Sequence, residues 1–135
     1  MTKYKKDVIT IFKKRNKEVF LVNTIKNELV TYEEFFKKTL GLISYFKSLN
    51  LTQGNKILIN RKNSEEYLIV FLAACLGGFS ILPVDPEISN ERLEVIKKTI
   101  KFDLIIYSSR LISTIYLIIH HKYFFLSFCF RTATV

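Results

Sequence analysis

The longest apolar stretch of this chain constrains its fold more than any other feature. Residues 67–84 contain a single polar side chain, that of a serine, in 18 consecutive positions. That length would suffice for a membrane-spanning helix. A Gly-Gly pair and a proline interrupt the stretch, however, and the residues after the glycines favour extended structure. The sequence therefore predicts a buried helix over residues 67–76 and, after Gly77 and Gly78, a buried strand over residues 79–84.

Helix and strand patterns alternate on both sides of this stretch. Thr31 and Glu34 are the two ends of a capping box, which predicts that a helix begins at this point. Apolar residues then recur at steps of three and four, as on one face of a helix. Short apolar runs at residues 56–60 and 104–107 are typical of strands, and Ser89 can cap a helix between residue 84 and the last of them.

This alternation predicts an α/β fold with a partial, mostly parallel sheet and crossover helices. The strands are continuously apolar, as expected when both faces of a sheet are covered. Residues 19–30 contain two short apolar runs around a polar turn, which predicts a β-hairpin before the sheet. Residues 1–18 are charged throughout and carry a weak apolar stripe, so we expect a short helix on the surface.

The charge composition limits the classes of partner. Lys and Arg number 21 against 12 acids, a formal net charge of +9, which raises the question of nucleic acid or an anionic membrane. Bases alternate with acids through most of the chain, and no interleaving of basic and aromatic residues of the RNA-binding type is visible. We therefore do not expect nucleic acid as a partner. Two cysteines are too few for a disulfide framework, which favours a cytoplasmic location.

No group of residues forms a convincing catalytic or ligand-binding motif. His120 and His121 are adjacent and lack a Cys or carboxylate at ligand spacing, so no metal site is expected. Gly77 and Gly78 lie at a helix end, whereas phosphate binding requires free amides at a helix start. Asp85 follows a strand, where α/β proteins bind ligands, but an Asp-Pro turn explains it. We predict no catalytic, cofactor-binding or metal-ligating residue. The paired carboxylates at helix starts, which capping explains, are Glu33 with Glu34 and Glu65 with Glu66.

Several segments, in order, resemble motifs of the adenylate-forming (AMP-binding) enzymes, which include acyl-CoA synthetases, nonribosomal-peptide adenylation domains and luciferases. Residues 29–35, LVTYEEF, are similar to the family's L-T/S-Y-x-E-L segment. Residues 72–86, LAACLGGFSILPVDP, look like its A-x-L-K-A-G-x-x-x-x-P-L-D-P motif. Within these motifs Leu76 replaces the usual Lys and Gly77 the usual Ala. Weaker matches lie at residues 49–57, where Asn55 replaces the usual Asp, and at residues 63–66 and 89–93.

The resemblance covers residues 19–109 and implies an incomplete N-terminal domain of an AMP-dependent synthetase or ligase. Full-length members activate a carboxylic acid as an acyl-adenylate with ATP and Mg, then transfer it to a thiol of coenzyme A or of carrier-protein phosphopantetheine. The family's phosphate-binding loop, adenine segment, Thr-Gly-Asp motif and late catalytic Lys have no counterpart in this sequence. The resemblance therefore implies a truncated fragment of an acid–thiol ligase that binds no cofactor and is inactive alone.

Residues 110–135 form a third segment, which is hydrophobic and unlike the family. This segment contains no acid, glycine or proline. One interpretation is translation out of frame after Ser109; another is a membrane anchor over residues 111–130, although Lys122 lies well inside that span. Two short strands or an unpaired hydrophobic tail are further alternatives.

Three functions stay open at this level. The first is the inactive fragment described above, and the second is one half of a split adenylating enzyme that a separately encoded neighbouring chain completes. The third is a small basic binding module, or one that associates with a membrane through residues 111–130. The carboxylic acid and the thiol acceptor are not predicted by any of these patterns.

Overall fold

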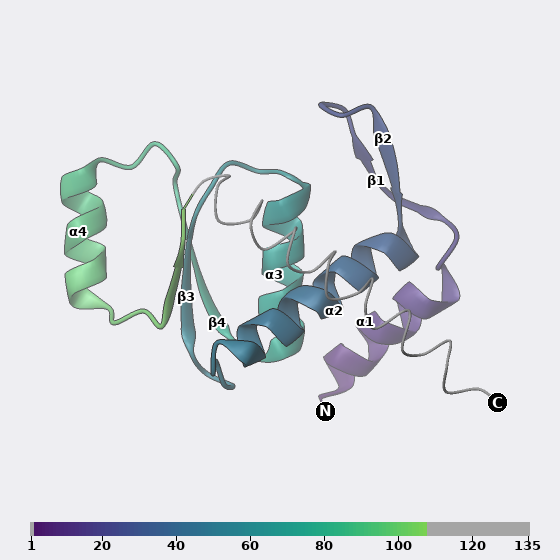
Figure 1. Cartoon of the computed structure of the whole chain (residues 1–135), viewed down its shortest axis with the longest axis horizontal. Helices are drawn as coiled ribbons and strands as arrows, with labels where there is room; N and C mark the ends of the chain where they lie inside the picture. Colours follow the sequence, from purple (N-terminus) through teal and green to yellow (C-terminus); the bar gives the residue numbers. More distant parts are fainter. Residues whose placement is uncertain (1, 108–135) are drawn as a thin grey trace.

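A computed structural model describes residues 2–107 of the chain (Figure 1). The alternatives for residues 110–135, including an anchor over residues 111–130, lie outside the described residues, as do His120 and His121. The described elements are α1 (Lys3–Lys14), β1 (Val19–Asn23), β2 (Glu28–Thr31), α2 (Tyr32–Ser48), β3 (Lys56–Asn60), α3 (Glu65–Gly77), β4 (Ser80–Val84), α4 (Asn90–Thr99) and β5 (Leu104–Ile106).

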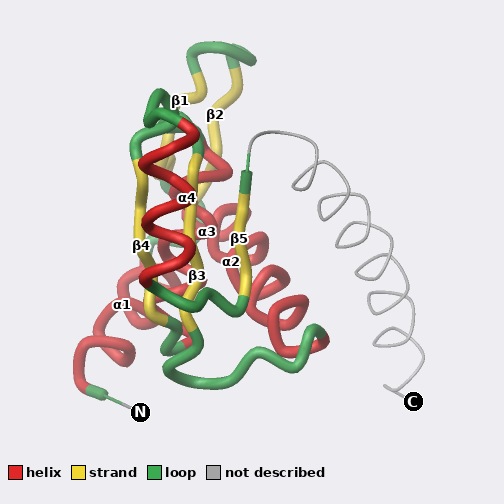
Figure 2. The backbone as a smooth tube through the Cα atoms, turned by 90° about the vertical axis from the view of Figure 1, so that its left-hand side faces the viewer, coloured by secondary structure: helices red, strands yellow, loops and turns green. Residues whose placement is uncertain are grey.

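The centre of the fold is a sheet of three parallel strands in the order β4-β3-β5 (Figure 2). Ile57 of β3 pairs with Ile81 of β4 on one side and with Leu104 of β5 on the other. Helix α3 connects β3 to β4, and α4 connects β4 to β5. Helices α2 and α3 lie on one side of the sheet and α4 on the opposite side (Figure 1). The predicted α/β fold with a parallel sheet, crossover helices and a preceding hairpin is therefore confirmed.

The main core lies between the sheet and helices α2 and α3. Ile57 and Ile59 of β3 are fully buried and face this core, together with Phe46 of α2. Because side chains alternate along a strand, Leu58 points to the other face of the sheet. There α4 covers it with Leu93, which is 7% exposed. The apolar strand sequences thus match burial on both faces.

Aromatic rings fasten the N-terminal elements to α2. Phe12 of α1, Phe20 of β1 and Phe35 of α2 contact one another, with ring centroids 4.5 to 6.1 Å apart. Tyr32 packs edge-on against both Phe12 and Phe20. Such pairs add to the stabilisation from burial alone. The helix expected in residues 1–18 is therefore α1, and it is attached to the domain through Phe12.

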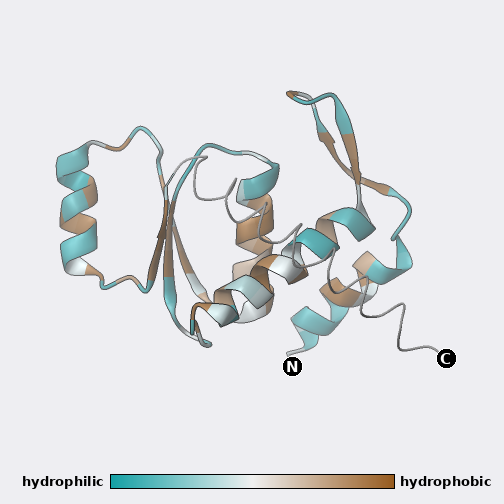
Figure 3. Ribbon diagram, viewed as in Figure 1, coloured by the Kyte–Doolittle hydropathy of each residue, from teal (hydrophilic) through white to brown (hydrophobic). Residues whose placement is uncertain are grey.

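Helix α3 departs from its prediction in one respect. Its sequence is apolar on all sides, which predicted burial on all sides. In the structure Leu68 is 39% and Phe71 41% exposed, while Val70 and Ala74 are buried. The prediction was wrong for the outer side because, among the described residues, α2 and the sheet cover only the inner side of α3 (Figure 3). Within residues 2–107, every helix is too short or too polar to cross a bilayer.

The predicted capping box is present at the start of α2. The Thr31 hydroxyl accepts a hydrogen bond from the Glu34 amide at 3.3 Å, and the Glu34 carboxylate accepts one from the Thr31 amide at 2.9 Å. The Thr31 amide is also the main reason why the pKa of Glu34 lies below its usual value.

Replacing Thr31 by alanine tests the contribution of this cap. The change leaves one helix-start amide without its partner, so we expect the free energy of unfolding to fall by about 1 kcal/mol. Urea denaturation followed by circular dichroism measures it. Thr10→Ala is the matched control, because the Thr10 hydroxyl is exposed and bonds only a carbonyl of its own helix. Equal midpoints for the two variants would show that the box contributes nothing.

Candidate functional site

The sheet has one position at which α/β proteins commonly bind ligands. After β3 the chain turns toward α3 on one face, and after β4 it turns toward α4 on the other face (Figure 1). The carboxyl ends of these neighbouring strands therefore diverge, and such a switch point forms a crevice at the edge of the sheet. We refer to the residues there as the carboxyl edge; they are Asn60 to Glu66 after β3 and Asp85 to Glu87 after β4.

Glu65 is the most buried charged residue of the carboxyl edge, with 6% of its surface exposed. Its Oε1 lies 2.5 Å from Nζ of Lys38 on α2, and its Oε2 accepts a hydrogen bond from Nδ2 of Asn23 at 3.3 Å. Both carboxylate oxygens therefore have partners, as a buried charge requires. Glu65 thereby joins three elements: the hairpin, α2 and α3.

Glu66 forms a second set of ion pairs beside the first. Arg61 Nη2 lies 3.3 Å and Lys26 Nζ 3.6 Å from its two carboxylate oxygens. Burial opposes ionisation of Glu66. Hydrogen bonds from its own amide and from the Ser64 hydroxyl, together with Arg61 and Lys26, outweigh burial and hold its pKa below the usual value. Glu66 is therefore an ionised partner of two cations, and it does not resemble a general acid.

Asp85 takes the turn role that the sequence suggested. Its Oδ1 accepts a hydrogen bond from the Glu87 amide at 2.8 Å, and its carbonyl accepts one from the Ile88 amide at 3.1 Å. Glu87 in turn lies 4.0 Å from Nζ of Lys62, so a weak and exposed ion pair connects the two diverging loops. Asp85 therefore shapes the β4–α4 turn.

A nucleoside triphosphate does not fit the carboxyl edge as the described residues form it. Phosphate binding at a helix start requires free amides and unpaired cations. At the start of α3 the Ser64 hydroxyl accepts the Tyr67 amide, and two carboxylates follow. The nearby cations Lys26, Lys38 and Arg61 are paired with those carboxylates. Residues 2–107 also contain no group of three or more His, Cys, Asp or Glu that could hold a metal ion.

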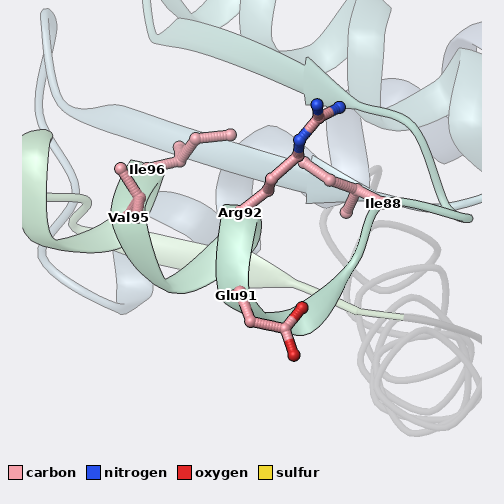
Figure 4. Close-up of a pocket in the computed structure, with 5 residues that line it drawn as sticks. All are labelled: Ile88, Glu91, Arg92, Val95 and Ile96. Carbon is pink, nitrogen blue, oxygen red and sulfur yellow. The ribbon is translucent and has the colours of Figure 1, made fainter.

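A shallow pocket beside α4 is also unsuited to catalysis (Figure 4). All of its lining residues come from α4 and the turn before it. Glu91 is the acid among them, and hydrogen bonds from its own amide and from the Ser89 hydroxyl hold its pKa below the usual value. Glu91 is therefore an ionised helix-start residue. The lining residues are Ile88, Glu91, Arg92, Val95 and Ile96.

Sequence reasoning missed the ion pairs of the carboxyl edge. It assigned Glu65 and Glu66 to capping, whereas Ser64 is the cap. The carboxylates contact residues 27 and 42 positions away in the sequence. The available signal was two adjacent acids at the start of an otherwise apolar helix, since a charge placed there needs a partner. Cys75, expected to be a buried free thiol, is free and half-buried, and burial raises its pKa.

Comparison with known proteins identifies relatives of this architecture. The family model described as AMP-binding enzyme matches residues 10–122. Tyrocidine synthase 3 of Brevibacillus parabrevis is 23% identical over 84 residues, which are 62% of this chain and 1% of that protein. The match to the family model begins within residues 1–18 and ends within residues 110–135.

Solved structures of three enzymes share the fold. The N-terminal subdomain of Klebsiella oxytoca NpsA in complex with 3-hydroxyanthranilyl-AMSN matches with a TM-score of 0.70 and 18% identity, over 78% of this chain and 27% of that chain. The N-terminal domain of FACL13 from Mycobacterium tuberculosis gives 0.72 and 15%, over 79% and 27%. A benzoate CoA ligase from Burkholderia xenovorans LB400 gives 0.73 and 13%, over 84% and 23%. The chain therefore spans about a quarter of each of these structures.

Proposed function

Because the chain belongs to the AMP-binding enzyme family, we propose that it forms the opening part of the N-terminal domain of an adenylating enzyme. The complete enzyme would activate a carboxylic acid with ATP as an acyl-adenylate and pass it to a thiol of coenzyme A or of a carrier protein. The family match over residues 10–122 is the observation that carries this proposal.

The positions of the family-like segments support a structural role for this part. The LVTYEEF segment contains the capping box that begins α2. The LAACLGGFSILPVDP segment contains the left-handed cap Gly78 that ends α3, strand β4, and the Asp85 turn that leads to α4. Each segment thus fixes a change of chain direction in the α/β unit. Their role in this chain is to build the sheet and its covering helices.

We further propose that residues 1–135 alone do not catalyse adenylation. The chain spans about a quarter of the solved structures that it resembles, and the cations at its carboxyl edge are committed to Glu65 and Glu66. The expected result is no ATP–pyrophosphate exchange by the purified chain with a panel of aliphatic, aromatic and amino acids. A full-length adenylating enzyme serves as the positive control, and circular dichroism verifies that the chain is folded. Exchange above the no-enzyme blank would refute the proposal.

A second candidate is half of a split enzyme. The exposed apolar side chains of Leu68 and Phe71 on the outer side of α3 favour it, since a further polypeptide would cover them. Co-expression with the reading frames adjacent to the gene, followed by the same exchange assay, distinguishes the candidates. Exchange that requires both chains would support the split enzyme, and its absence with every neighbour would favour the inactive fragment.

Cytoplasmic location and a membrane anchor over residues 111–130 remain proposals of the same kind. Carbonate extraction separates them, since an inserted segment stays with the membrane and a soluble chain is released. The downstream DNA in all three frames tests translation out of frame after Ser109: a Ser/Thr/Gly-rich phosphate loop in another frame would support it.

A further inference from the structure

The outer face of α1 is the most one-sided charged surface of the described residues. Lys3, Lys6, Lys13 and Lys14 are all exposed, and Asp7 is the sole acid of the helix. Within residues 2–107, none of these four lysines takes part in a salt bridge. Elsewhere in the described chain, Lys26, Lys38, Arg61 and Lys97 are each paired with a glutamate. The lysines of α1 therefore carry charge that the described fold does not use.

The helical spacing gathers this charge on one side. Phe12 points inward and is buried against the aromatic rings of β1 and α2. The four lysines follow one another at intervals of three, seven and one residues, which places them on the side of the helix away from Phe12. Helix α1 packs on α2 at the end of the molecule farthest from the sheet (Figure 1). Its outer face is therefore directed away from the rest of the described fold.

Two apolar side chains border the lysines. Tyr4 is 58% and Ile11 50% exposed, and they lie two turns apart on the same side of α1. Aromatic and aliphatic side chains beside lysines are the pattern of a helix that lies in a membrane interface, where the apolar groups enter the headgroup layer and the lysines contact anionic lipids. An RNA backbone would use the lysines but would gain nothing from Ile11. The combination therefore favours a lipid surface over a nucleic acid.

We propose that the outer face of α1 is a docking surface for an anionic phospholipid bilayer, which the chain binds peripherally. The lysines supply attraction to anionic headgroups, and Tyr4 and Ile11 anchor the helix at the interface. This binding is independent of the proposed adenylating function and of residues 111–130. It is reversible and weakens as salt screens the lysines.

Sedimentation of the full chain with vesicles tests this proposal. The probe is a vesicle of phosphatidylcholine with about one-third phosphatidylserine, compared with pure phosphatidylcholine. Because each lysine near such a surface changes binding about fivefold, K6Q/K13Q/K14Q is expected to reduce the partition coefficient about 100-fold. The matched control K62Q/K98Q/K101Q removes the same charge from exposed lysines outside α1 and should bind like the wild type. Equal loss in both triple variants would overturn the proposal, because net charge alone would then explain binding.

A second variant separates lipid from other anionic partners. Ile11→Ser keeps every charge and changes an exposed side chain, so the fold should persist by circular dichroism. It is expected to reduce vesicle binding severalfold and to leave the binding of a single-stranded RNA unchanged. Vesicle binding that is unaffected by Ile11→Ser and by K6Q/K13Q/K14Q, or that resists both salt and carbonate, would overturn the proposal. Loss of RNA binding alone in the lysine variant would assign the face to nucleic acid instead.

Discussion

Replacing Lys38 by methionine is expected to lower the free energy of unfolding by about 3 kcal/mol. The side chain of Glu65 is 3% exposed, so without Lys38 its carboxylate would stay buried with Asn23 as its remaining side-chain partner. Lys38 is 29% exposed, and its flexible stem can reach water when Glu65 is absent. We therefore expect Glu65→Leu to cost less than Lys38→Met. Urea denaturation of the two variants measures this order.

The double variant K38M/E65L completes the thermodynamic cycle. It removes both charges and leaves apolar side chains of similar volume, so its stability should lie close to that of the wild type. Glu94→Gln is the matched control, since Glu94 forms a similarly short ion pair with Lys97 that is exposed and local. That control should leave the urea midpoint nearly unchanged. If Lys38→Met behaved like Glu94→Gln, the buried pair would not be what holds the hairpin and α2 to α3.

The difference between these two ion pairs also explains what the sequence could predict. The capping box, the left-handed cap at Gly78 and the alternation of helix and strand depend on residues within a few positions of one another. Their local patterns therefore determine them, and the parallel α/β fold follows from their order. The pairs of Glu65 with Lys38 and Asn23 form only after the hairpin, α2 and α3 have packed together. No spacing rule connects residues so far apart, so only the fold itself reveals this site.

Exposure was the other property that local patterns failed to predict. An apolar helix indicates burial, but the number of its sides that are covered depends on which other elements are present. For α3, the outer side with Leu68 and Phe71 lies beyond the reach of α2 and the sheet. The same reasoning applies to Tyr4 and Ile11 of α1, whose exposure could not be read from the weak apolar stripe of that helix.

Gly77→Ala is expected to destabilise the chain by about 1–2 kcal/mol, although alanine is the better helix former. Gly77 is the last residue of α3, and an added Cβ would lie 2.4 Å from Cε2 and 2.8 Å from Cδ2 of Phe79. The Phe79 ring is 7% exposed and packs edge-on against Phe46, with ring centroids 5.5 Å apart, so it has little room to move. The family-like motif has alanine where this chain has Gly77. The large side chain of Phe79 gives a physical reason for that departure.

Phe79→Val tests whether the two positions depend on each other. Valine lacks the ring atoms that a Cβ at Gly77 would meet, so in this background Gly77→Ala should become stabilising by up to about 1 kcal/mol. Gly78→Ala is the control, because Gly78 has φ +79° and its penalty comes from the left-handed backbone. That penalty should be the same with Phe79 or Val at position 79. If both glycine substitutions responded equally to Phe79→Val, a general loosening of the core would explain the change, and Gly77 would owe nothing to Phe79.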